Sequence, residues 1–318
     1  MYYTTMQGEV RAVDGIDFEL NSSEVLGIVG ESGCGKSSLA STLMKLLPTN
    51  SKIKGGKIML DGRDLVPMSD SEVRSKVRWS KIALVPQGAM NALNPIFKVG
   101  DQIAEAITIH SDVSRGDAKR RTAELLRLVG VDPSRSKNYP HEFSGGMKQR
   151  AMIAMALALT PKIVIADEPT TALDVIVQAG IIKLMVGIKK DLGTSFILIT
   201  HDLALVAQMS EKVAIMYAGK FVETGMSSEV YKNALHPYTL GLLGAFADIR
   251  RPKEELTSVP GAPPDLIEPP SGCRFNPRCP YAKDICREEE PKLLEATPGH
   301  RVACHFWKEI SESRMGRS

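Results

Sequence analysis

The residues best suited to chemistry in this 318-residue chain form the string GESGCGKS at 30–37. Glycines at this spacing let backbone amides face a phosphate, the lysine neutralises phosphate charge, and the final serine hydroxyl can ligate Mg²⁺. We therefore predict that Lys36 contacts the β- and γ-phosphates of a nucleotide and that Ser37 contacts Mg²⁺. The whole predicted phosphate site comprises Gly30, Ser32, Gly33, Cys34, Gly35, Lys36, Ser37 and Ser38.

A second turn that could bind a ligand is Ser144-Gly145-Gly146, which precedes the helical pattern MKQRAMIAMALAL. The free amides and the positive end of a helix make such a start an anion site. An ordinary N-cap with two flexible glycines explains the same residues. The apolar run IVIADEP at 163–169 lies shortly after this turn in the sequence and favours the interpretation as an anion site.

Four short apolar runs must position these groups, and each is followed by a residue able to contact a nucleotide. Continuous apolar runs of this length are typical of buried parallel strands, and ligands bind beyond the carboxyl ends of such strands. The sequence therefore predicts an α/β fold in which all four ends meet at one phosphate site. The runs are VLGIV, IALVP, IVIA and FILIT, followed by Gly30, Gln87, Asp167 and His201.

Phosphoryl transfer needs positioning and charge neutralisation, which assigns roles to these residues. We predict that Asp167 holds Mg²⁺ and that Glu168 activates the attacking water as general base. His201 is expected to donate to the γ-phosphate, and Gln87 to sense Mg²⁺ or water. Adjacent carboxylates diverge along an extended strand, but Pro169 indicates that this strand ends there. Taken singly, Gln87 could be a plain loop residue and His201 the neighbour of a helix cap.

Together these strings resemble the ATPase cassettes of ABC transporters. The resemblance implies a P-loop NTPase with a RecA-like core, an inserted helical subdomain at about 90–160 and a small β-rich N-terminal part. It also implies that two cassettes pair head to tail, so that Ser144, Gly145 and Gly146 serve the ATP of the partner. Tyr3 resembles the residue that stacks on adenine, with Tyr2 as its rival, and Thr171 stands in a D-loop string where serine is more usual.

Two further strings, ALNPIFKVGDQIAEAI at 92–107 and HPYTLGLL at 236–243, resemble the peptide and nickel importer branch of that family. The resemblance implies an ATP-hydrolysing subunit that powers import of di- or oligopeptides. Its implied partners are two transmembrane permease subunits, a second homologous ATPase or a second copy of this chain, and an extracytoplasmic substrate-binding protein. Some members of the branch carry oligosaccharides, so oligosaccharides and nickel remain alternative cargoes.

The amino-acid composition limits the possible fold class, binding partners and location of the protein. A hydrophobic content of 43% with 5% aromatic residues fits a compact α/β protein, and a net charge of +3 gives no argument for nucleic acid. The apolar helical run 151–160 is shorter than the roughly 20 residues of a membrane span, and no signal peptide is apparent at the N-terminus. We expect a peripheral protein on the cytoplasmic face of the membrane.

The predicted division is a nucleotide-binding domain at 1–235 and a C-terminal extension at 236–318. The extension contains a proline-rich segment at 250–272, and the string at 212–225, before the extension, predicts a β-hairpin. Because the tail is far in sequence from Lys36, we expect it to take no part in hydrolysis.

Four of the five cysteines lie in that extension: Cys273, Cys279, Cys286 and Cys304. In a reducing cytoplasm clustered cysteines bind metal more often than they form disulfides. Zinc sites usually contain close cysteine pairs, whereas Fe–S clusters accept more varied spacings. CRFNPRCPYAKDIC also resembles the tail of dipeptide-type ATPases, which implies a [4Fe–4S] cluster.

A zinc site that includes His300 or His305 is the first alternative for the cysteines, and unliganded thiols are the second. A different class of protein, a soluble ABC ATPase with a zinc-binding interaction tail, fits the same residues. The fifth cysteine, Cys34, is expected to be no more than a target for alkylation.

Overall fold

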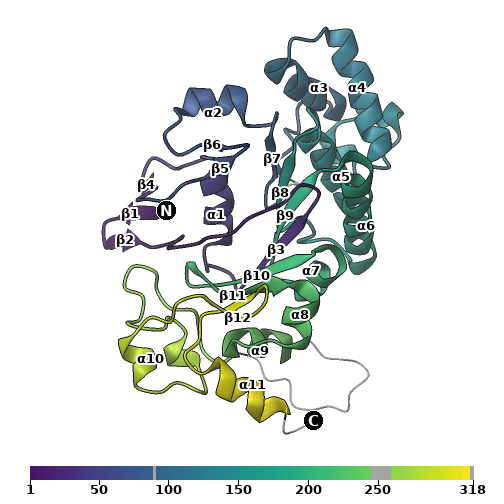
Figure 1. The fold of residues 1–318 in the computed structure, drawn as a ribbon. Coiled ribbons are helices and arrows are strands. Elements are labelled where there is room, and N and C mark those ends of the chain that lie inside the picture. Colours follow the sequence, from purple (N-terminus) through teal and green to yellow (C-terminus); the bar gives the residue numbers. More distant parts are fainter. Residues whose placement is uncertain (89–90, 245–258, 316–318) are drawn as a thin grey trace.

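A mixed sheet of eight strands forms the centre of the computed structural model, which describes residues 1–88, 91–244 and 259–315 (Figure 1). The strand order across the sheet is β12-β13-β11-β10-β3-β9-β8-β7. The strands are β3 (Val25–Val29), β7 (Ile82–Val85), β8 (Ile163–Asp167), β9 (Ser195–Thr200), β10 (Lys212–Tyr217), β11 (Lys220–Met226), β12 (Leu294–Thr297) and β13 (His300–Val302).

The four strands predicted from the apolar runs are confirmed and lie side by side. β3, β9, β8 and β7 are mutually parallel, and β10 continues the parallel set on the other side of β3. Val29 pairs with Thr200 and Asp167 pairs with Ile199, so the carboxyl ends of these strands reach the same edge of the sheet. That edge is where the sequence places the phosphate site.

Side chains of β3 alternate between the two faces of the sheet, as the period of a strand requires. Val25 and Val29 pack into the core cluster formed with the helices α5 (Gly145–Ala156), α6 (Val175–Leu192) and α7 (Leu203–Met209). Leu26 and Ile28 pack into the second cluster, with α1 (Lys36–Leu43) and α2 (Asp70–Lys76). Both faces are therefore covered, which explains why the runs are apolar throughout.

The run SSLASTLMKLL at 37–47 predicts a helix that Pro48 stops, but the last helical residue of α1 is Leu43. Lys45 takes a left-handed backbone with φ of 48° and donates from Nζ to the carbonyl of Val66 at 2.9 Å. This side-chain contact anchors the turn before the proline is reached.

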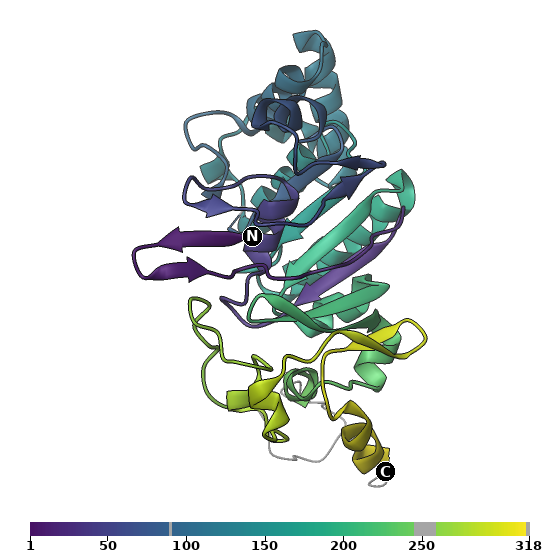
Figure 2. The same ribbon diagram turned by 60° about the vertical axis from the view of Figure 1, so that its left-hand side comes forward.

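Two further helices, α3 (Val99–His110) and α4 (Arg115–Leu128), lie with α5 between β7 and β8 in the chain. Figures 1 and 2 place α3 and α4 at one end of the molecule, opposite the C-terminal segment, by which we mean the described residues from 236 on. Short 3₁₀ turns occur at Pro133–Lys137, Pro140–Glu142 and Asn276–Arg278.

The N-terminal residues form a separate three-stranded sheet in the order β2-β1-β4, and a β5–β6 hairpin follows. The strands are β1 (Tyr2–Thr5), β2 (Gly8–Val10), β4 (Ser51–Lys52), β5 (Met59–Leu60) and β6 (Arg63–Asp64).

The C-terminal segment continues the central sheet rather than standing apart from it. β13 pairs antiparallel with β11, with Glu223 opposite Val302, and β12 pairs with β13 at the sheet edge. The predicted hairpin at 212–225 is confirmed and turns at Ala218 and Gly219, both with positive φ. The helices that follow the hairpin are α8 (Ser227–Lys232), α9 (Pro237–Gly244), α10 (Ile285–Glu288) and α11 (Trp307–Met315).

Part of the proline-rich stretch predicted at 250–272 lies outside the described residues, which resume at 259.

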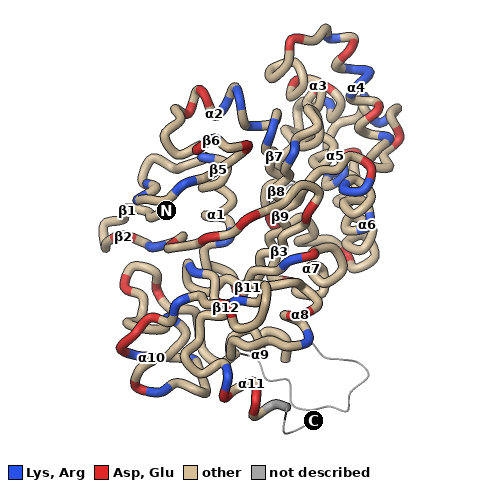
Figure 3. The backbone as a smooth tube through the Cα atoms, in the orientation of Figure 1, with Lys and Arg blue, Asp and Glu red and all other residues tan. Residues whose placement is uncertain are grey.

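None of the helices in the described ranges combines the length and apolar character that crossing a membrane requires. Segments rich in Lys and Arg alternate with segments rich in Asp and Glu over most of the elements (Figure 3).

Candidate nucleotide site

The predicted phosphate loop connects the end of β3 to the start of α1. Gly33 and Gly35 have φ of 80° and 108°, a backbone region that favours glycine. A Cβ on Gly35 would lie 2.0 Å from the carbonyl oxygen of Ala12. Both glycines are therefore required by the backbone of this tight turn, the kind of turn in which successive amides can face an anion.

Lys36 is the first residue of α1 and is buried, with 5% of its surface exposed. Its Nζ donates to the carbonyl oxygens of Gly30 at 2.7 Å and Glu31 at 2.8 Å. These bonds hold the ammonium inside the turn of the loop. Ser37 follows at the helix start and is exposed, as a hydroxyl must be to reach a bound cation.

Asp167, the last residue of β8, carries a buried carboxylate whose Oδ1 has no hydrogen-bond partner among the described residues. Burial raises the pKa of this carboxyl, opposed by a hydrogen bond from Ser37 and the nearby charge of Lys36. A buried acceptor without a partner is costly unless a ligand supplies one. Mg²⁺ is commonly held by one or two carboxylates together with substrate phosphates, so Asp167 and Ser37 fit this ion.

Glu168 lies next to Asp167 but is turned away from the strand by a left-handed backbone with φ of 47°. Its amide donates to the carbonyl of Ile199 at 2.8 Å, which fixes this turn against β9. The sequence predicts that the strand ends here so that both carboxylates can serve one site. The structure confirms the end of the strand and supplies the backbone turn.

Three side chains converge on the Glu168 carboxylate. Gln87 donates from Nε2 to Oε2 at 3.2 Å, Thr171 donates from its hydroxyl to Oε2 at 2.9 Å, and Nδ1 of His201 lies 3.3 Å from Oε1. Burial raises the pKa of Glu168, but the hydrogen bonds from Thr171 and His201 outweigh burial and lower the pKa below its usual value. Glu168 is thus an ionised carboxylate, as a base for water must be.

Exposure differs within this group in a way that suits its chemistry. The Glu168 side chain is 13% exposed, whereas the His201 side chain is 61% exposed. The His201 side chain is therefore open to a ligand from solution, whereas the Glu168 carboxylate is largely covered by protein.

Thr171 is a contact that the sequence does not reveal. It stands three residues after Glu168, in the segment that resembles a D-loop, where its replacement of serine carries no predicted consequence. In the structure its hydroxyl donates directly to the Glu168 carboxylate, the group predicted to act as general base. The hydroxyl that threonine shares with serine is the only available signal.

The Ser144 turn begins α5 in an extended conformation, and its hydroxyl accepts from the amide of Met147 at 3.3 Å. Ser144 is exposed, and the helix start is open to an external ligand. A Cβ on Gly146 would lie 2.6 Å from Cγ1 of Val177, so packing against α6 also requires this glycine. That the Ser144-Gly145-Gly146 turn contacts the ATP of another cassette stays a prediction.

The two tyrosines proposed for adenine differ in their contacts. The Tyr3 hydroxyl lies 3.0 Å from Oγ of Ser38, next to the phosphate loop. The Tyr2 hydroxyl donates to Oδ1 of Asp14 at 2.7 Å. Tyr3 is thus tied to a residue of the predicted site and Tyr2 is not, but stacking on adenine stays a prediction.

Cys34 does not have the environment of a reactive thiol. It is 2% exposed, and burial raises its pKa. The thiolate is the reactive form of cysteine. The expectation that Cys34 is a target for alkylation is therefore wrong for the folded chain.

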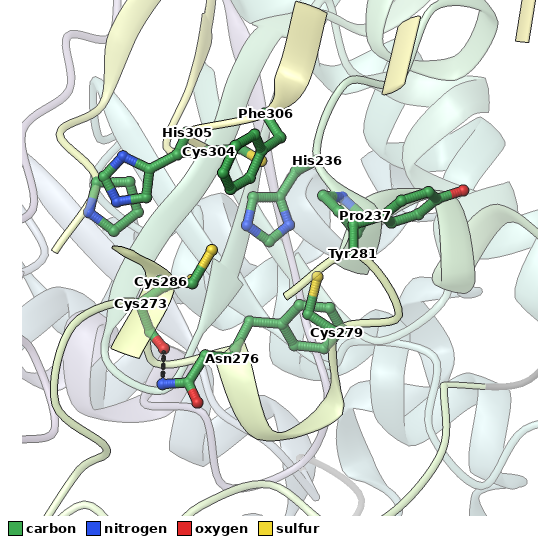
Figure 4. Close-up of a pocket in the computed structure, with 12 residues that line it drawn as sticks. His236, Pro237, Cys273, Asn276, Cys279, Tyr281, Cys286, Cys304, His305 and Phe306 are labelled. Atoms are coloured by element: carbon green, nitrogen blue, oxygen red, sulfur yellow. Dashed lines mark hydrogen bonds between the residues drawn. The ribbon is translucent and has the colours of Figure 1, made fainter. Parts of the chain in front are cut away.

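Four cysteines of the C-terminal segment, Cys273, Cys279, Cys286 and Cys304, line one pocket (Figure 4). Burial raises the pKa of Cys273 to about 11 and that of Cys304 to about 12. In the described residues no group of three or more His, Cys, Asp or Glu side chains is arranged to hold a single metal ion. The pocket gathers the predicted thiols without bringing them to one point.

The histidines proposed for a mixed zinc site are already engaged. Nε2 of His300 lies 2.8 Å from Oε1 of the buried Glu223, away from the cysteines. His305 lines the cysteine pocket, but its Nε2 bonds to the carbonyl of Glu289 at 3.0 Å. His236 also lines the pocket, and the sequence does not single it out. His300 is therefore excluded as a partner of these cysteines.

The C-terminal segment also contacts the phosphate loop, which its distance in sequence does not predict. Arg278 forms an ion pair with Glu31 of the loop, and the Tyr238 hydroxyl accepts from the Glu31 amide at 2.9 Å. The amide of Gly219, at the β10–β11 turn, donates to the carbonyl of Cys34 at 2.8 Å. The tail therefore lies against the phosphate loop despite its distance in sequence, while the expectation that it takes no part in hydrolysis stays a prediction.

Comparison with known proteins identifies two matching regions. Residues 13–171 match the family described as ABC transporter, and residues 222–286 match the family described as oligopeptide/dipeptide transporter, C-terminal region. A probable peptide ABC transporter ATP-binding protein of Sinorhizobium fredii is 49% identical over 94% of this chain and 90% of its own length. An oligopeptide transport ATP-binding protein of Bacillus subtilis is 48% identical over 94% of this chain and 85% of its own length.

Among solved structures, a dimeric ATP-binding cassette bound to ADP and phosphate has the same fold, with a TM-score of 0.64. It is 24% identical, and the match covers 71% of this chain and 95% of the cassette.

Proposed function

The chain belongs to the ATP-binding proteins of ABC transporters, and from that premise we propose that it is the ATP-hydrolysing subunit of an importer of di- and oligopeptides. The arrangement that carries the hydrolysis is the Glu168 carboxylate, held by Gln87, Thr171 and His201 beside the phosphate loop. The match of residues 222–286 to the C-terminal region of oligopeptide and dipeptide transporters favours peptides as cargo.

Some residues of this site bind the nucleotide and Mg²⁺, and others act in the hydrolysis step. Lys36 and the loop amides bind the phosphates, while Ser37 and the free oxygen of Asp167 would hold Mg²⁺. Mg²⁺ supplies neutralisation of phosphate charge when bound. Glu168 accepts the proton of the attacking water, and His201 donates to the γ-phosphate from its exposed position.

We propose that the cassette works as a pair. The Ser144 turn opens to solvent at the start of a twelve-residue helix, which suits it to the ATP held by a second cassette. The second cassette is a homologous ATPase or another copy of this chain. Two permease subunits then couple it to the membrane at the cytoplasmic face, and an extracytoplasmic binding protein delivers the peptide.

We further propose that the extension at 236–318 follows a cassette at 1–235 and holds a [4Fe–4S] cluster on its four cysteines. Thiols from separate segments of the chain line one pocket, which suits a cluster because each thiolate binds a different iron. A single zinc instead needs four ligand atoms within about 2.3 Å of one point. Protein purified without oxygen should be brown and contain about four irons per chain. Stoichiometric zinc without iron would refute the cluster.

Peptide uptake by whole cells tests the function itself. Cells that carry Glu168→Gln in place of the wild-type chain should lose uptake of a labelled tripeptide, because the amide cannot accept the proton of water. Uptake of a labelled oligosaccharide and of Ni²⁺ in the same cells separates the alternative cargoes. Normal peptide uptake in cells whose Glu168→Gln chain is expressed and inactive toward ATP would refute peptide import.

A further inference from the structure

Glu31, the second residue of the phosphate loop, is held from three sides. Its carboxylate receives two bonds from Arg278, from Nη1 to Oε2 at 2.6 Å and from Nη2 to Oε1 at 2.9 Å. Its amide donates to the Tyr238 hydroxyl, and its carbonyl accepts from Nζ of Lys36. One residue therefore joins the C-terminal segment to the lysine that binds phosphate.

The Arg278 side chain has little freedom to leave this position. Its Nε donates to the carbonyl of Pro260 at 2.6 Å, and Nη2 also reaches the carbonyl of Gly261 at 3.2 Å. The Tyr217 hydroxyl lies 3.4 Å from Nη1, and the side chain is only 5% exposed. A two-bonded arginine–carboxylate pair with so little exposure is stronger and more directional than a surface ion pair.

The backbone around Arg278 is equally fixed. Arg278 ends the 3₁₀ turn Asn276–Arg278, and its amide donates to the carbonyl of Phe275 at 3.0 Å. Phe275 packs against Tyr217 and Tyr238, with ring centroids 5.1 and 5.4 Å apart. The same aromatic cluster thus supports both groups that contact Glu31.

We propose that Arg278 and Tyr238 are positioning residues for ATP binding, which hold Glu31 so that the loop amides and Lys36 keep the arrangement that receives the phosphates. The inference rests on the proposed function, because it requires that the loop binds ATP. The C-terminal segment then contributes to nucleotide affinity without touching the nucleotide. Arg278 acts through Glu31 and has no part in the chemistry of hydrolysis.

The affinity of the full-length chain for ATP with Mg²⁺, measured by titration calorimetry, tests this role. Arg278→Met and Glu31→Gln should each weaken ATP binding about tenfold, which corresponds to about 1.4 kcal/mol. The double variant should bind no more weakly than either single variant, because both remove the same contact. Arg278→Lys keeps the charge but loses one of two bonds, so it should lie between Arg278→Met and the wild type.

Arg274→Met is the matched control. Arg274 is another nearly buried arginine of the same segment, but its ion pair is with Asp14 and not with the phosphate loop. It should lose thermal stability as Arg278→Met does, yet bind ATP within twofold of the wild type.

Two results would overturn the proposal: ATP binding by a folded Arg278→Met within twofold of the wild type, or losses that multiply in the double variant. If Arg278→Met does not fold, Glu31→Gln carries the test, since the Glu31 side chain is 26% exposed and better tolerates change. A wild-type chain that binds no ATP would instead refute the proposed function.

Discussion

Glu223→Gln should destabilise the chain measurably, because this buried carboxylate joins the core sheet to the C-terminal segment. Its Oε1 accepts from the amide of Leu235 at 2.7 Å and its Oε2 accepts from the amide of His236 at 3.0 Å. His300 adds a third contact, to Oε1, and Glu223 has no exposed surface.

The size of the effect follows from the two carboxylate oxygens. Each receives a backbone N–H, and glutamine has only one oxygen, so either orientation of its amide leaves one buried N–H facing an NH₂ group. An unsatisfied buried donor costs about 1–3 kcal/mol, so we expect a loss of about 2 kcal/mol. At about 2 °C for each kcal/mol in a large domain, the melting temperature should fall by about 4 °C.

Thermal unfolding followed by circular dichroism at neutral pH measures this loss. Glu124→Gln is the control, since Glu124 lies on α4 with 59% of its side chain exposed and, within the part of the chain that the structure describes, pairs with Arg121 alone. It should change the melting temperature by about 1 °C or less, as surface changes usually do. Equal melting temperatures for the two variants would refute the role assigned to the Glu223 contacts.

Three further predictions concern the nucleotide site. Thr171→Val removes a donor to Glu168 and should raise the pKa of that carboxyl, so the acidic limb of the pH profile of kcat/KM for ATP should move to higher pH, whereas Thr171→Ser should leave it in place. Gly35→Ala should abolish ATP binding in a titration, because the added Cβ meets the Ala12 carbonyl at 2.0 Å in a left-handed backbone. Ser144→Arg should leave ATP binding by the monomer intact yet prevent ATP-dependent dimerisation in size-exclusion chromatography, whereas Lys36→Ala should abolish both. Weakened ATP affinity of the Ser144→Arg monomer would argue against the proposal that Ser144 contacts the ATP bound to the other cassette.

The strands of the core and the residues at their ends could be predicted because each signal is local. VLGIV and IVIAD are apolar throughout since both faces of the sheet are covered, and Gly30 and Asp167 follow at once. The convergence of Gln87 and His201 on Glu168 then follows from parallel pairing of neighbouring strands.

The contacts made by the C-terminal segment could not be predicted in the same way. Arg278 meets Glu31 across 247 positions of sequence, and His300 meets Glu223 across 77 positions. Neither pair leaves a periodic pattern, because a contact between distant segments is set by the packing of everything between them. The contact of Thr171 with Glu168 is unpredictable for a different reason, since it depends on the left-handed backbone turn at Glu168.

The late position of β13 in the chain has a consequence for synthesis on the ribosome. β11 is complete at Met226, but the strand that covers its edge begins only at His300. While the intervening residues are being added, β11 presents an unpaired edge, the feature through which nascent chains associate with one another. A chain truncated in this interval would contain the phosphate loop but would keep an open sheet edge, which favours association with other chains.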